Sequence, residues 1–371
     1  MNLIKAVYVA TTPDRNPAEL AENIAREQSL ELTRRLIPEP IAERWLGQVL
    51  AVTRMDEQRW RLEIAYPSAL ASDQIGQLLH LLYGNISFYP RIRLTELTLP
   101  DSLLRAMPGP RAGLPGIRAY VDVPQRALLM SVLKPRGSAP AVLADLALAF
   151  ARGGGDLIKD DQNLVEQDLG AFRDRVSACA AAVDQAADAT GRRCLYLPHV
   201  AGSGDHLRRQ LDMVVELGLE GVVLCTWVMG LETAATAARE RGLMWLSHPA
   251  FAGTMTESED RGIATPVLLG TLVRVAGADI SIFPGPGGRI QSSDQRDIRA
   301  TCRALTEPLG TLAPALPCFG GGKTLDQAPS VTATHGSDIA LLVGGDLIGR
   351  GAAIEADTRA TIKALETATG H

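Results

Sequence analysis

The first hundred residues alternate between short runs with a period of two and longer runs with helical spacing. Leu3–Thr11 predicts a strand, and Pro17–Ser29 places Leu20 and Ile24 on one face of a helix. The other predicted elements are a hairpin of Val49–Arg54 and Arg59–Ala65, a helix Ser72–Tyr83 capped by Ser72, and an extended segment Arg91–Pro100. This order of strands and helices predicts a small open sheet with helices on one face.

Residues 101–127 interrupt the pattern with proline and glycine. They contain Pro108-Gly109-Pro110, Gly113 and Pro115-Gly116, and such clusters are typical of turns between folded units. The 371 residues of the chain are enough for two domains. We therefore expect a first domain over residues 1–112 and a second over residues 113–371.

After this boundary, short apolar runs alternate with longer helical ones. The predicted strands are Leu128–Leu133, Asp156–Ile158, Leu195–His199, Gly221–Cys225, Met244–His248, Asp279–Phe283, Leu316–Phe319 and Ile339–Val343. Helical stretches separate them, and an eighth helix is expected over Arg350–Thr369. Eight such units predict a (β/α)₈ barrel, with a doubly wound open sheet as the alternative. We favour the barrel because glycines and polar residues follow nearly every strand, at the end where barrel active sites lie.

Composition narrows the class of protein. Hydrophobic residues make up 46% of the chain and the formal net charge is −5, which favours a large core and argues against nucleic-acid binding. No apolar run approaches the roughly 18 residues of a membrane span, and Met1–Pro13 predicts a strand rather than a cleavable signal. Scattered cysteines without a CxxC pair predict reduced thiols in a cytoplasm. They are Cys179, Cys194, Cys225, Cys302 and Cys318.

Residues 153–163, Gly-Gly-Gly-Asp-Leu-Ile-Lys-Asp-Asp-Gln-Asn, carry the strongest candidate chemistry. The second barrel strand is predicted to end here in Lys159, Asp161 and Gln162. Hard cations such as Mg²⁺ take oxygen ligands from carboxylates and carbonyls, so this strand end is a candidate divalent-metal site. The alternative is a structural Lys–Asp ion pair.

Cations and histidines follow other strands. Lys134 and Arg136 follow the first strand, where they would bind an anionic substrate, or Lys134 would act as a general base if desolvation lowers its pKa. A solvated loop is the alternative. His199 follows the third strand and His248 the fifth, and a histidine at a barrel mouth serves as acid, base or oxyanion partner. We favour a functional role for His248 and a structural one for His199.

Glycine-rich loops follow the last three strands. Residues 283–289 form a loop with a single cation, Arg289, which predicts either a mobile lid or a plain turn. Gly321-Gly322, followed by Lys323, and Gly344-Gly345 come after strands seven and eight. Barrels often bind phosphate there, because bare backbone N–H groups approach the oxyanion closely. Tight turns that merely need glycine are the alternative.

With these residues in place, the chain resembles the large subunit of RuBisCO and, more closely, the RuBisCO-like proteins. Residues 153–161 match the family's activation motif, and Lys134-Pro135-Arg136 matches its Lys-Pro-Lys. Further matches in the expected order are Gly84-Asn85, Arg91–Pro100, Gly109-Pro110, Gly116, Ser247-His248, Gly277-Ala278-Asp279, Gly321-Gly322 and Gly344-Gly345. The resemblance implies a ferredoxin-like α+β N-terminal domain before a TIM barrel, with Mg²⁺ on a carbamylated Lys159. It also implies a homodimer in which Glu27 and Asn85 reach the partner's barrel.

Departures from the family pattern change the expected reaction. They are Gln162 for a glutamate ligand, Pro249 for an arginine, Ala252 for a second histidine, Ile282 for a phosphate-binding histidine and Arg289 for the lysine that steers CO₂ chemistry. The metal site thereby loses a negative charge, so its affinity for Mg²⁺ should fall. One phosphate site loses its cations while the glycine pairs retain the other. The resemblance therefore implies a substrate with one phosphate and no CO₂ fixation.

What remains implies proton abstraction next to the carbonyl of a sugar-phosphate-like monophosphate. Lys134 is the expected base or proton shuttle, and His248 and Arg289 are expected to contact the substrate. One outcome is enolisation or isomerisation of a methylthio-pentulose phosphate in methionine salvage. The other is decarboxylation of a 3-oxo sugar-acid phosphate, which Lys323 mildly favours as a cation for a carboxylate. A non-catalytic, phosphate-binding or regulatory relative is the alternative, motivated by Gln162.

Overall fold

The N-terminal part of the chain forms four strands of a five-stranded sheet with the order β10-β4-β1-β3-β2, whose edge strand β10, Gly262–Ile263, comes from the second part of the chain. The computed structural model describes residues 2–12, 16–290 and 295–368. β1 is antiparallel to both of its neighbours, β3 and β4, as in a ferredoxin-like domain. The elements are β1 Leu3–Thr11, α1 Pro17–Glu27, α2 Glu39–Trp45, β2 Gln48–Arg54, β3 Arg59–Pro67, α3 Ile75–Tyr83, β4 Ile92–Thr98 and α4 Asp101–Ala106. The predicted ferredoxin-like fold is confirmed.

Helix α1 shows how the local sequence produces this arrangement. Asn16 caps the helix, and its Oδ1 accepts a hydrogen bond from the Ala18 N–H at 3.0 Å. The helix buries one apolar face, formed by Leu20, Ala21, Ile24 and Ala25. This face packs toward β2 and β3, so burial of apolar surface holds the helix on the sheet.

The predicted cap of the second helix is wrong. Helix α3 begins at Ile75, three residues after Ser72. The φ angles of Ser72 and Asp73 are +50° and +53°, in the left-handed region. Ser72 follows a 3₁₀ helix, Ser68–Ala71, and ends it rather than starting α3. A serine before an apolar run therefore marked the end of one turn instead of the start of the next.

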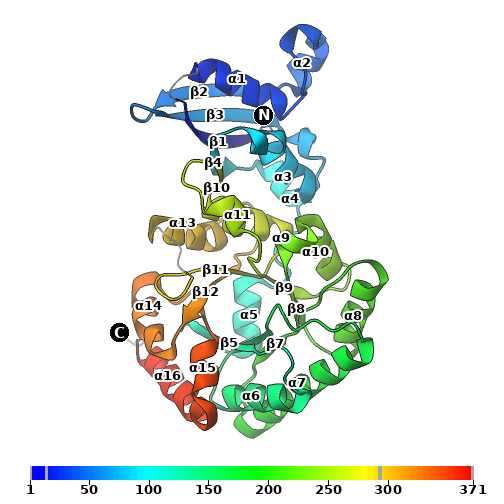
Figure 1. Cartoon of the computed structure of the whole chain (residues 1–371), viewed down its shortest axis with the longest axis vertical. Helices are drawn as coiled ribbons and strands as arrows, with labels where there is room; N and C mark the ends of the chain where they lie inside the picture. The colour runs from blue at the N-terminus through cyan, green and yellow to red at the C-terminus, as the bar shows by residue number, and fades with distance from the viewer. Residues whose placement is uncertain (1, 13–15, 291–294, 369–371) are drawn as a thin grey trace.

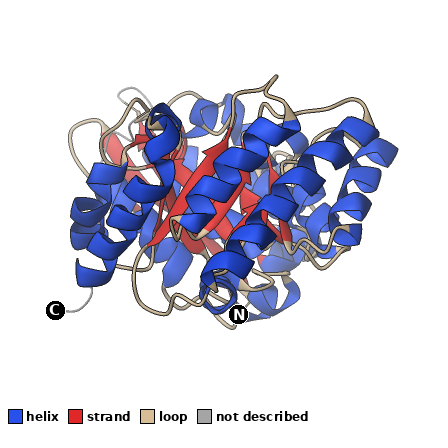
Figure 2. Cartoon of the chain, turned by 90° about the horizontal axis from the view of Figure 1, so that it is seen from below, coloured by secondary structure: helices blue, strands red, loops and turns tan. Residues whose placement is uncertain are grey.

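The second part of the chain forms eight parallel strands in the order β7-β6-β5-β13-β12-β11-β9-β8. The strands are β5 Leu128–Leu133, β6 Leu157–Asp160, β7 Leu195–Leu197, β8 Gly221–Leu224, β9 Met244–Ser247, β11 Ile280–Pro284, β12 Leu316–Lys323 and β13 Ala340–Val343. A parallel bridge between His199 and Val223 joins the two end strands and closes the ring. Seen from below, helices surround the strands (Figure 2). The barrel prediction is confirmed, and the doubly wound alternative is wrong.

Helices and short helical turns alternate with the strands of this barrel. They are α6 Pro140–Arg152, α7 Leu169–Thr190, α8 Gly204–Glu216, α9 Thr226–Met229, α10 Leu231–Arg239, α11 Gly253–Thr256, α12 Val273–Ala276, α13 Gln295–Thr306, α14 Ala328–His335, α15 Gly345–Gly349 and α16 Ile354–Ala368. The last helix starts at Ile354 rather than Arg350, because Gly351–Ala353 form a separate 3₁₀ turn. The predicted end at Thr369 lies outside the described residues. No helix in the described part of the chain is long and apolar enough to cross a membrane.

One helix closes the N-terminal end of the barrel. Helix α5, Gly113–Val121, buries Leu114, Ile117 and Val121. These side chains form one core cluster with the first residues of most barrel strands, among them Leu128, Leu157, Leu195, Met244, Ile280, Leu316 and Ala340. Figure 1 shows α5 within the ring of strands. Because this end is filled, the large cavity of the barrel lies at the opposite, C-terminal end of the strands.

A short strand joins the two parts of the chain. β10, Gly262–Ile263, follows the segment after β9 and pairs in parallel with β4 of the N-terminal sheet. The Gly262 N–H donates to the Tyr83 hydroxyl at 2.7 Å, and that hydroxyl donates to the Ile92 carbonyl at 2.6 Å. Figure 1 shows β10 between the N-terminal sheet and the barrel. The chain after β9 is thus anchored in the N-terminal sheet.

Candidate active site

A cavity of about 660 Å³ lies at the C-terminal ends of the barrel strands. Residues that follow six different strands contribute to it. Its candidate chemical groups are Lys134, Lys159, Asp161, Gln162, His248, Arg289, Gly321, Gly322, Lys323, Gly344 and Gly345. Residues far apart in the sequence meet here because parallel strands all deliver their C-terminal ends to the same mouth.

Lys159 lies in the wall of the cavity at the end of β6. Its side chain is buried, and its Nζ donates a hydrogen bond to the Asp160 carbonyl at 2.7 Å. Burial lowers the pKa of Lys159, while the nearby carboxylates of Asp161 and Asp160 act in the opposite direction. A lower pKa leaves more of the amine neutral, and a neutral amine is the form that reacts with electrophiles.

Asp160 points away from the cavity. Its carboxylate pairs with Arg175 and accepts hydrogen bonds from the Tyr196 hydroxyl at 2.9 Å and the His199 N–H at 3.0 Å. Arg175 also binds Glu166 at 2.6 Å. Successive side chains of a strand point to opposite sides. Asp160 therefore forms a structural ion pair, while its neighbours Lys159 and Asp161 line the cavity. Arg175 is the structural partner, and its position 15 residues along the chain gave no local signal.

The two candidate histidines differ in their surroundings. His248 lines the cavity, and its Nδ1 accepts a hydrogen bond from the Ala250 N–H at 3.2 Å. Burial lowers the pKa of His248 well below 6.5, and the neighbouring Lys159 acts in the same direction. His248 is therefore a neutral imidazole with its proton on Nε2, ready to donate.

His199 does not line the cavity. Its Nδ1 lies 3.4 Å from the Leu164 carbonyl, and its Nε2 lies 3.6 Å from the Cys225 Sγ. Burial lowers the pKa of His199 as well. These contacts hold the chain after β7 in place, which fits the structural role expected for this residue. All five cysteines, Cys225 included, are free thiols.

The first-strand cations separate in the structure. Lys134 lines the cavity, whereas Arg136 is exposed and lies outside the lining. A β-carbon on Gly344 would lie 3.1 Å from the Lys134 Nζ. The amine therefore lies directly beside the glycine pair that follows β13, at the place where a phosphate-bearing substrate would meet it.

The glycine pair of β12 has a backbone conformation that glycine adopts easily. The φ angles of Gly321 and Gly322 are +96° and +92°. A β-carbon on Gly321 would lie 2.4 Å from the Ile290 carbonyl oxygen. Both positions therefore require glycine, because of their φ angles and because residues 285–290 approach them closely. We call residues 285–290 the strand-six loop.

Lys323 differs from its expected role. Its Nζ donates to the carbonyls of Pro286, at 2.5 Å, and of Gly287, both in the strand-six loop. Burial lowers the pKa of Lys323 to about 8. Two of the three ammonium donors are thus occupied by protein, and the contact with a substrate carboxylate that the sequence suggested has lost its main support.

The wall beside His248 is largely apolar. Pro249, Ala250, Ala252, Leu269 and Ile282 contribute to it. Lining residues to which the sequence assigned no role include Thr256, Glu257, Leu269, Thr324 and Asp346. Asp346 directly follows the glycine pair after β13 and was detectable by that position, whereas Leu269 lies in a π-helical turn, Pro266–Leu272, with no comparable signal.

Glu27 and Asn85 lie in the N-terminal domain and do not line the cavity of their own chain. The Asn85 Nδ2 donates to the Glu27 Oε1 at 3.1 Å. Both side chains are half-buried. The bond holds the two polar groups together as one unit on the surface of this domain.

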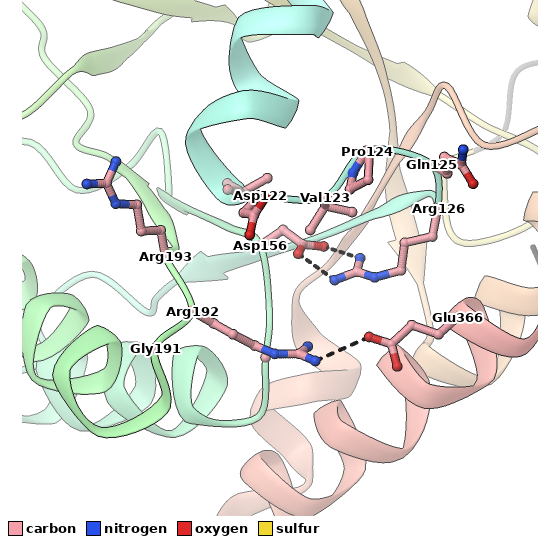
Figure 3. Close-up of a pocket in the computed structure, with 12 residues that line it drawn as sticks. Asp122, Val123, Pro124, Gln125, Arg126, Asp156, Gly191, Arg192, Arg193 and Glu366 are labelled. Carbon is pink, nitrogen blue, oxygen red and sulfur yellow. Dashed lines mark hydrogen bonds and ion pairs between the residues drawn. The ribbon is translucent and has the colours of Figure 1, made fainter.

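A second, smaller pocket of about 340 Å³ lies at the opposite face of the barrel, and Figure 3 shows residues that line it. Arg126 and Asp156 form a bidentate ion pair there, with both N–O distances 2.7 Å. Arg192 pairs with Glu366 at 3.3 Å. These four charges are matched within the protein, so they help to hold this face of the barrel together.

Oxygen-donor side chains of the mouth suit a hard cation. Asp161 supplies a carboxylate and Gln162 an amide oxygen beside the Lys159 amine. The Asp161 Oδ1 accepts a hydrogen bond from the Asn163 N–H at 2.9 Å, which fixes its orientation. No group of three His, Cys, Asp or Glu side chains converges within the described ranges. A divalent cation would therefore need a further oxygen ligand from a modified Lys159, from substrate or from water.

Comparison with known proteins relates this geometry to a family. Residues 113–370 match the family described as ribulose bisphosphate carboxylase large chain, catalytic domain. The chain is 39% identical over 360 residues to ribulose bisphosphate carboxylase-like protein 1 of Rhodopseudomonas palustris, and the match covers 95% of each chain. A crystal structure of a RuBisCO-like protein from Rhodopseudomonas palustris has a TM-score of 0.89 and 33% identity, covering 100% of this chain and 99% of that one.

Other relatives carry the names of activities. The chain is 36% identical over 352 residues to 5-methylthioribulose-1-phosphate isomerase of Rhodospirillum rubrum, with 93% of this chain and 91% of the relative covered. It is 34% identical over 291 residues to 2,3-diketo-5-methylthiopentyl-1-phosphate enolase of Geobacillus thermodenitrificans, with 78% of this chain and 70% of the relative covered.

Proposed function

This chain belongs to the ribulose bisphosphate carboxylase large-chain family, and we propose that it is a RuBisCO-like enolase or isomerase that acts on a sugar-phosphate-like monophosphate without fixing CO₂. The observation that carries the proposal is the composition of one cavity. It brings the Lys134 amine beside the Gly344-Gly345 pair and faces both with an apolar wall. Relatives named as an isomerase and an enolase support the same reaction class.

Proton abstraction is the step that this geometry suits. The Lys134 side chain would accept a proton from the carbon next to the substrate carbonyl, the C–H electrons would form a C=C bond, and the carbonyl oxygen would take the negative charge. The His248 Nε2–H would donate a hydrogen bond to that oxygen. An isomerisation is complete when the former carbonyl carbon takes the proton and the neighbouring hydroxyl passes its own proton to the former carbonyl oxygen, so that it becomes the new carbonyl. Return of the proton to the enolate oxygen completes an enolisation.

The two ends of the substrate would meet different surfaces. The glycine pairs of β12 and of the turn after β13 would bind the phosphate through backbone N–H groups. Ala252 and Ile282 lie in the apolar wall, which offers no cation for a second phosphate. This wall favours an uncharged, apolar end of the substrate, such as a methylthio group. Lys323 gives no support for a sugar acid, because its amine is bound by the strand-six loop. Of the two outcomes expected from the sequence, we therefore propose the methylthio-pentulose phosphate rather than decarboxylation.

We propose Mg²⁺ as the cofactor, held by Asp161, Gln162 and a carbamylated Lys159. When bound, the ion would supply Lewis-acid stabilisation of negative charge on a substrate oxygen. The lowered pKa of Lys159 supports carbamylation, because the neutral amine is the form that adds to CO₂. Carbamylation would also provide the second negatively charged oxygen ligand that Gln162 cannot supply.

We further propose a homodimer with sites shared between its two chains. Phe88, three residues after Asn85, is 91% exposed, and Phe251 beside the cavity is 65% exposed. Aromatic side chains are enriched at protein–protein interfaces, so these two support a contact surface near the candidate binding residues. A partner's N-terminal domain would cover them and would bring its Glu27 and Asn85 toward the cavity. The free cysteines support a cytoplasmic location.

Proton exchange tests the proposed function directly. The protein is incubated with 5-methylthioribulose 1-phosphate, bicarbonate and Mg²⁺ in D₂O, and deuterium uptake is followed by proton NMR. We expect uptake at the carbon next to the carbonyl that depends on protein concentration. Ribulose 1,5-bisphosphate with ¹⁴C-bicarbonate serves as the comparison and should yield no fixed label. Absence of exchange with this and other enolisable monophosphates would contradict the proposal.

The alternative is a non-catalytic phosphate-binding relative, which the single substitution at Gln162 favours. It predicts Mg²⁺-dependent binding of the same monophosphate, measured by calorimetry, without any deuterium uptake. Exchange that is lost in Lys134→Ala while that variant stays folded would exclude it.

A further inference from the structure

The buried amine of Lys323 has partners that substrate binding does not explain. The side chain is 1% exposed, although it ends in a group that is charged in water. Its hydrogen bonds to the Pro286 and Gly287 carbonyls reach the strand-six loop across the cavity rim. Burying a cation costs free energy unless it is hydrogen-bonded. The carbonyls provide that compensation, so the amine and the loop stabilise each other.

The backbone of the strand-six loop also follows the glycine segment of β12. The Ile290 N–H donates to the Gly321 carbonyl at 2.9 Å, and the Gly285 N–H to the Gly320 carbonyl at 3.4 Å. A β-carbon on Gly288 would lie 2.6 Å from the Gly321 carbonyl oxygen. Lys323, two residues further along β12, therefore adds side-chain bonds to an existing backbone contact.

We propose that Lys323 is a positioning residue for the proposed reaction, whose amine fastens the strand-six loop to β12 and so presents Arg289 to the cavity. Arg289 lies in this loop directly between Gly288 and Ile290, the two residues that contact Gly321. If the loop moves away from β12, Arg289 moves with it. The expected effect on turnover rests on the proposed function, whereas the fastening itself does not.

Hydrogen exchange tests the fastening without any substrate. In Lys323→Met, the backbone amides of peptides covering residues 285–290 should exchange about tenfold faster. The two Lys323 hydrogen bonds are missing in this variant, so local opening of the loop costs less free energy. Lys363→Met, the same change on exposed α16, is the matched control and should leave these peptides unchanged. Gly288→Ala, which forces the loop off β12 with Lys323 intact, should accelerate the same peptides. Unchanged exchange in folded Lys323→Met would overturn the proposal.

Kinetics test whether Lys323 acts through Arg289. Lys323→Met should lower kcat/KM for the monophosphate about tenfold, and it should cause little further loss in an Arg289→Ala background. Full additivity of the two substitutions would overturn the positioning role. If no monophosphate is turned over, the proposed function fails, and the exchange measurement alone still decides whether Lys323 fastens the loop.

Discussion

The two ends of the barrel use buried charge in opposite ways. At the N-terminal face, Arg126 and Asp156 neutralise each other, and the Asp279 carboxylate accepts backbone N–H bonds from Ala112 at 2.7 Å, Gly113 at 2.8 Å and Trp245 at 3.0 Å. At the C-terminal mouth, the side chains of Lys134 and Lys159 line a cavity, and neither forms an ion pair with a carboxylate of the described residues. Removing one member of a pair that is satisfied within the protein leaves a buried charge uncompensated, whereas charges turned to a cavity remain available for a ligand. Substitutions at the two ends should therefore separate stability from activity.

The largest expected effect is at the mouth. Lys134→Ala should lower kcat for deuterium exchange by about 10²- to 10⁴-fold, the usual contribution of a general base. The free energy of unfolding should hardly change, because the amine lines a cavity. Stopped-exchange NMR and urea denaturation measure the two quantities, with Lys363→Ala as the control for loss of a lysine. A loss of stability comparable to the loss of activity would erase the contrast between the two ends.

At the opposite face, Asp156→Ala should lower the free energy of unfolding by about 3–5 kcal/mol, because Arg126 is left buried without its partner. The same carboxylate also accepts the Leu129 N–H at 2.8 Å. The fraction that remains folded should keep its kcat. Urea denaturation is the measurement, and Asp188→Ala on exposed α7 is the control. A selective fall in kcat would show that this face takes part in the reaction.

A smaller effect is expected from restoring a carboxylate at the mouth. Gln162→Glu adds a hard, charged oxygen ligand, so Mg²⁺ should bind on the order of tenfold more tightly. Calorimetric titration with Mg²⁺ in the presence of bicarbonate measures this change. Gln125→Glu, in the pocket of the N-terminal face, is the matched control and should leave Mg²⁺ binding as it is. Equal Mg²⁺ affinity in Gln162→Glu and the natural chain would argue against a cation at this strand end.

The smallest effect is a pH dependence of stability. The pKa of His248 is lowered by burial in the folded state, so the unfolded chain takes up the proton more readily. The stability contributed by the neutral imidazole is therefore complete above about pH 6.5 and is lost as the pH falls below it, by at most about 1.4 kcal/mol per pH unit. His248→Asn should flatten this decline in thermal unfolding between pH 6.5 and 5. An unchanged slope would mean that other groups, such as His199, produce it.

Much of the fold followed from local patterns. The sequence-predicted bounds of β1 and β5 agree with the structure to the residue, because each is an apolar run between polar or proline-rich segments. The errors occur where a polar residue can either end one element or begin the next. Ser72 was expected to start a helix and instead ends a 3₁₀ turn, since the choice depends on how the preceding strand leaves the sheet.

The sequence by itself determined the order of the strands and the types of residue near their C-terminal ends, because the period of the hydrophobic pattern and the family motif are local properties. It did not determine the exact ends, since β6 and β12 extend to Asp160 and Lys323 instead of ending at Ile158 and Phe319. Only the tertiary structure decided which of these groups share the cavity. It directed Lys134 inward and left Arg136 exposed, gave Asp160 to Arg175, and turned Lys323 toward the strand-six loop. These outcomes depend on partners that lie far away in the sequence, and a side chain's direction follows from the packing that brings those partners together.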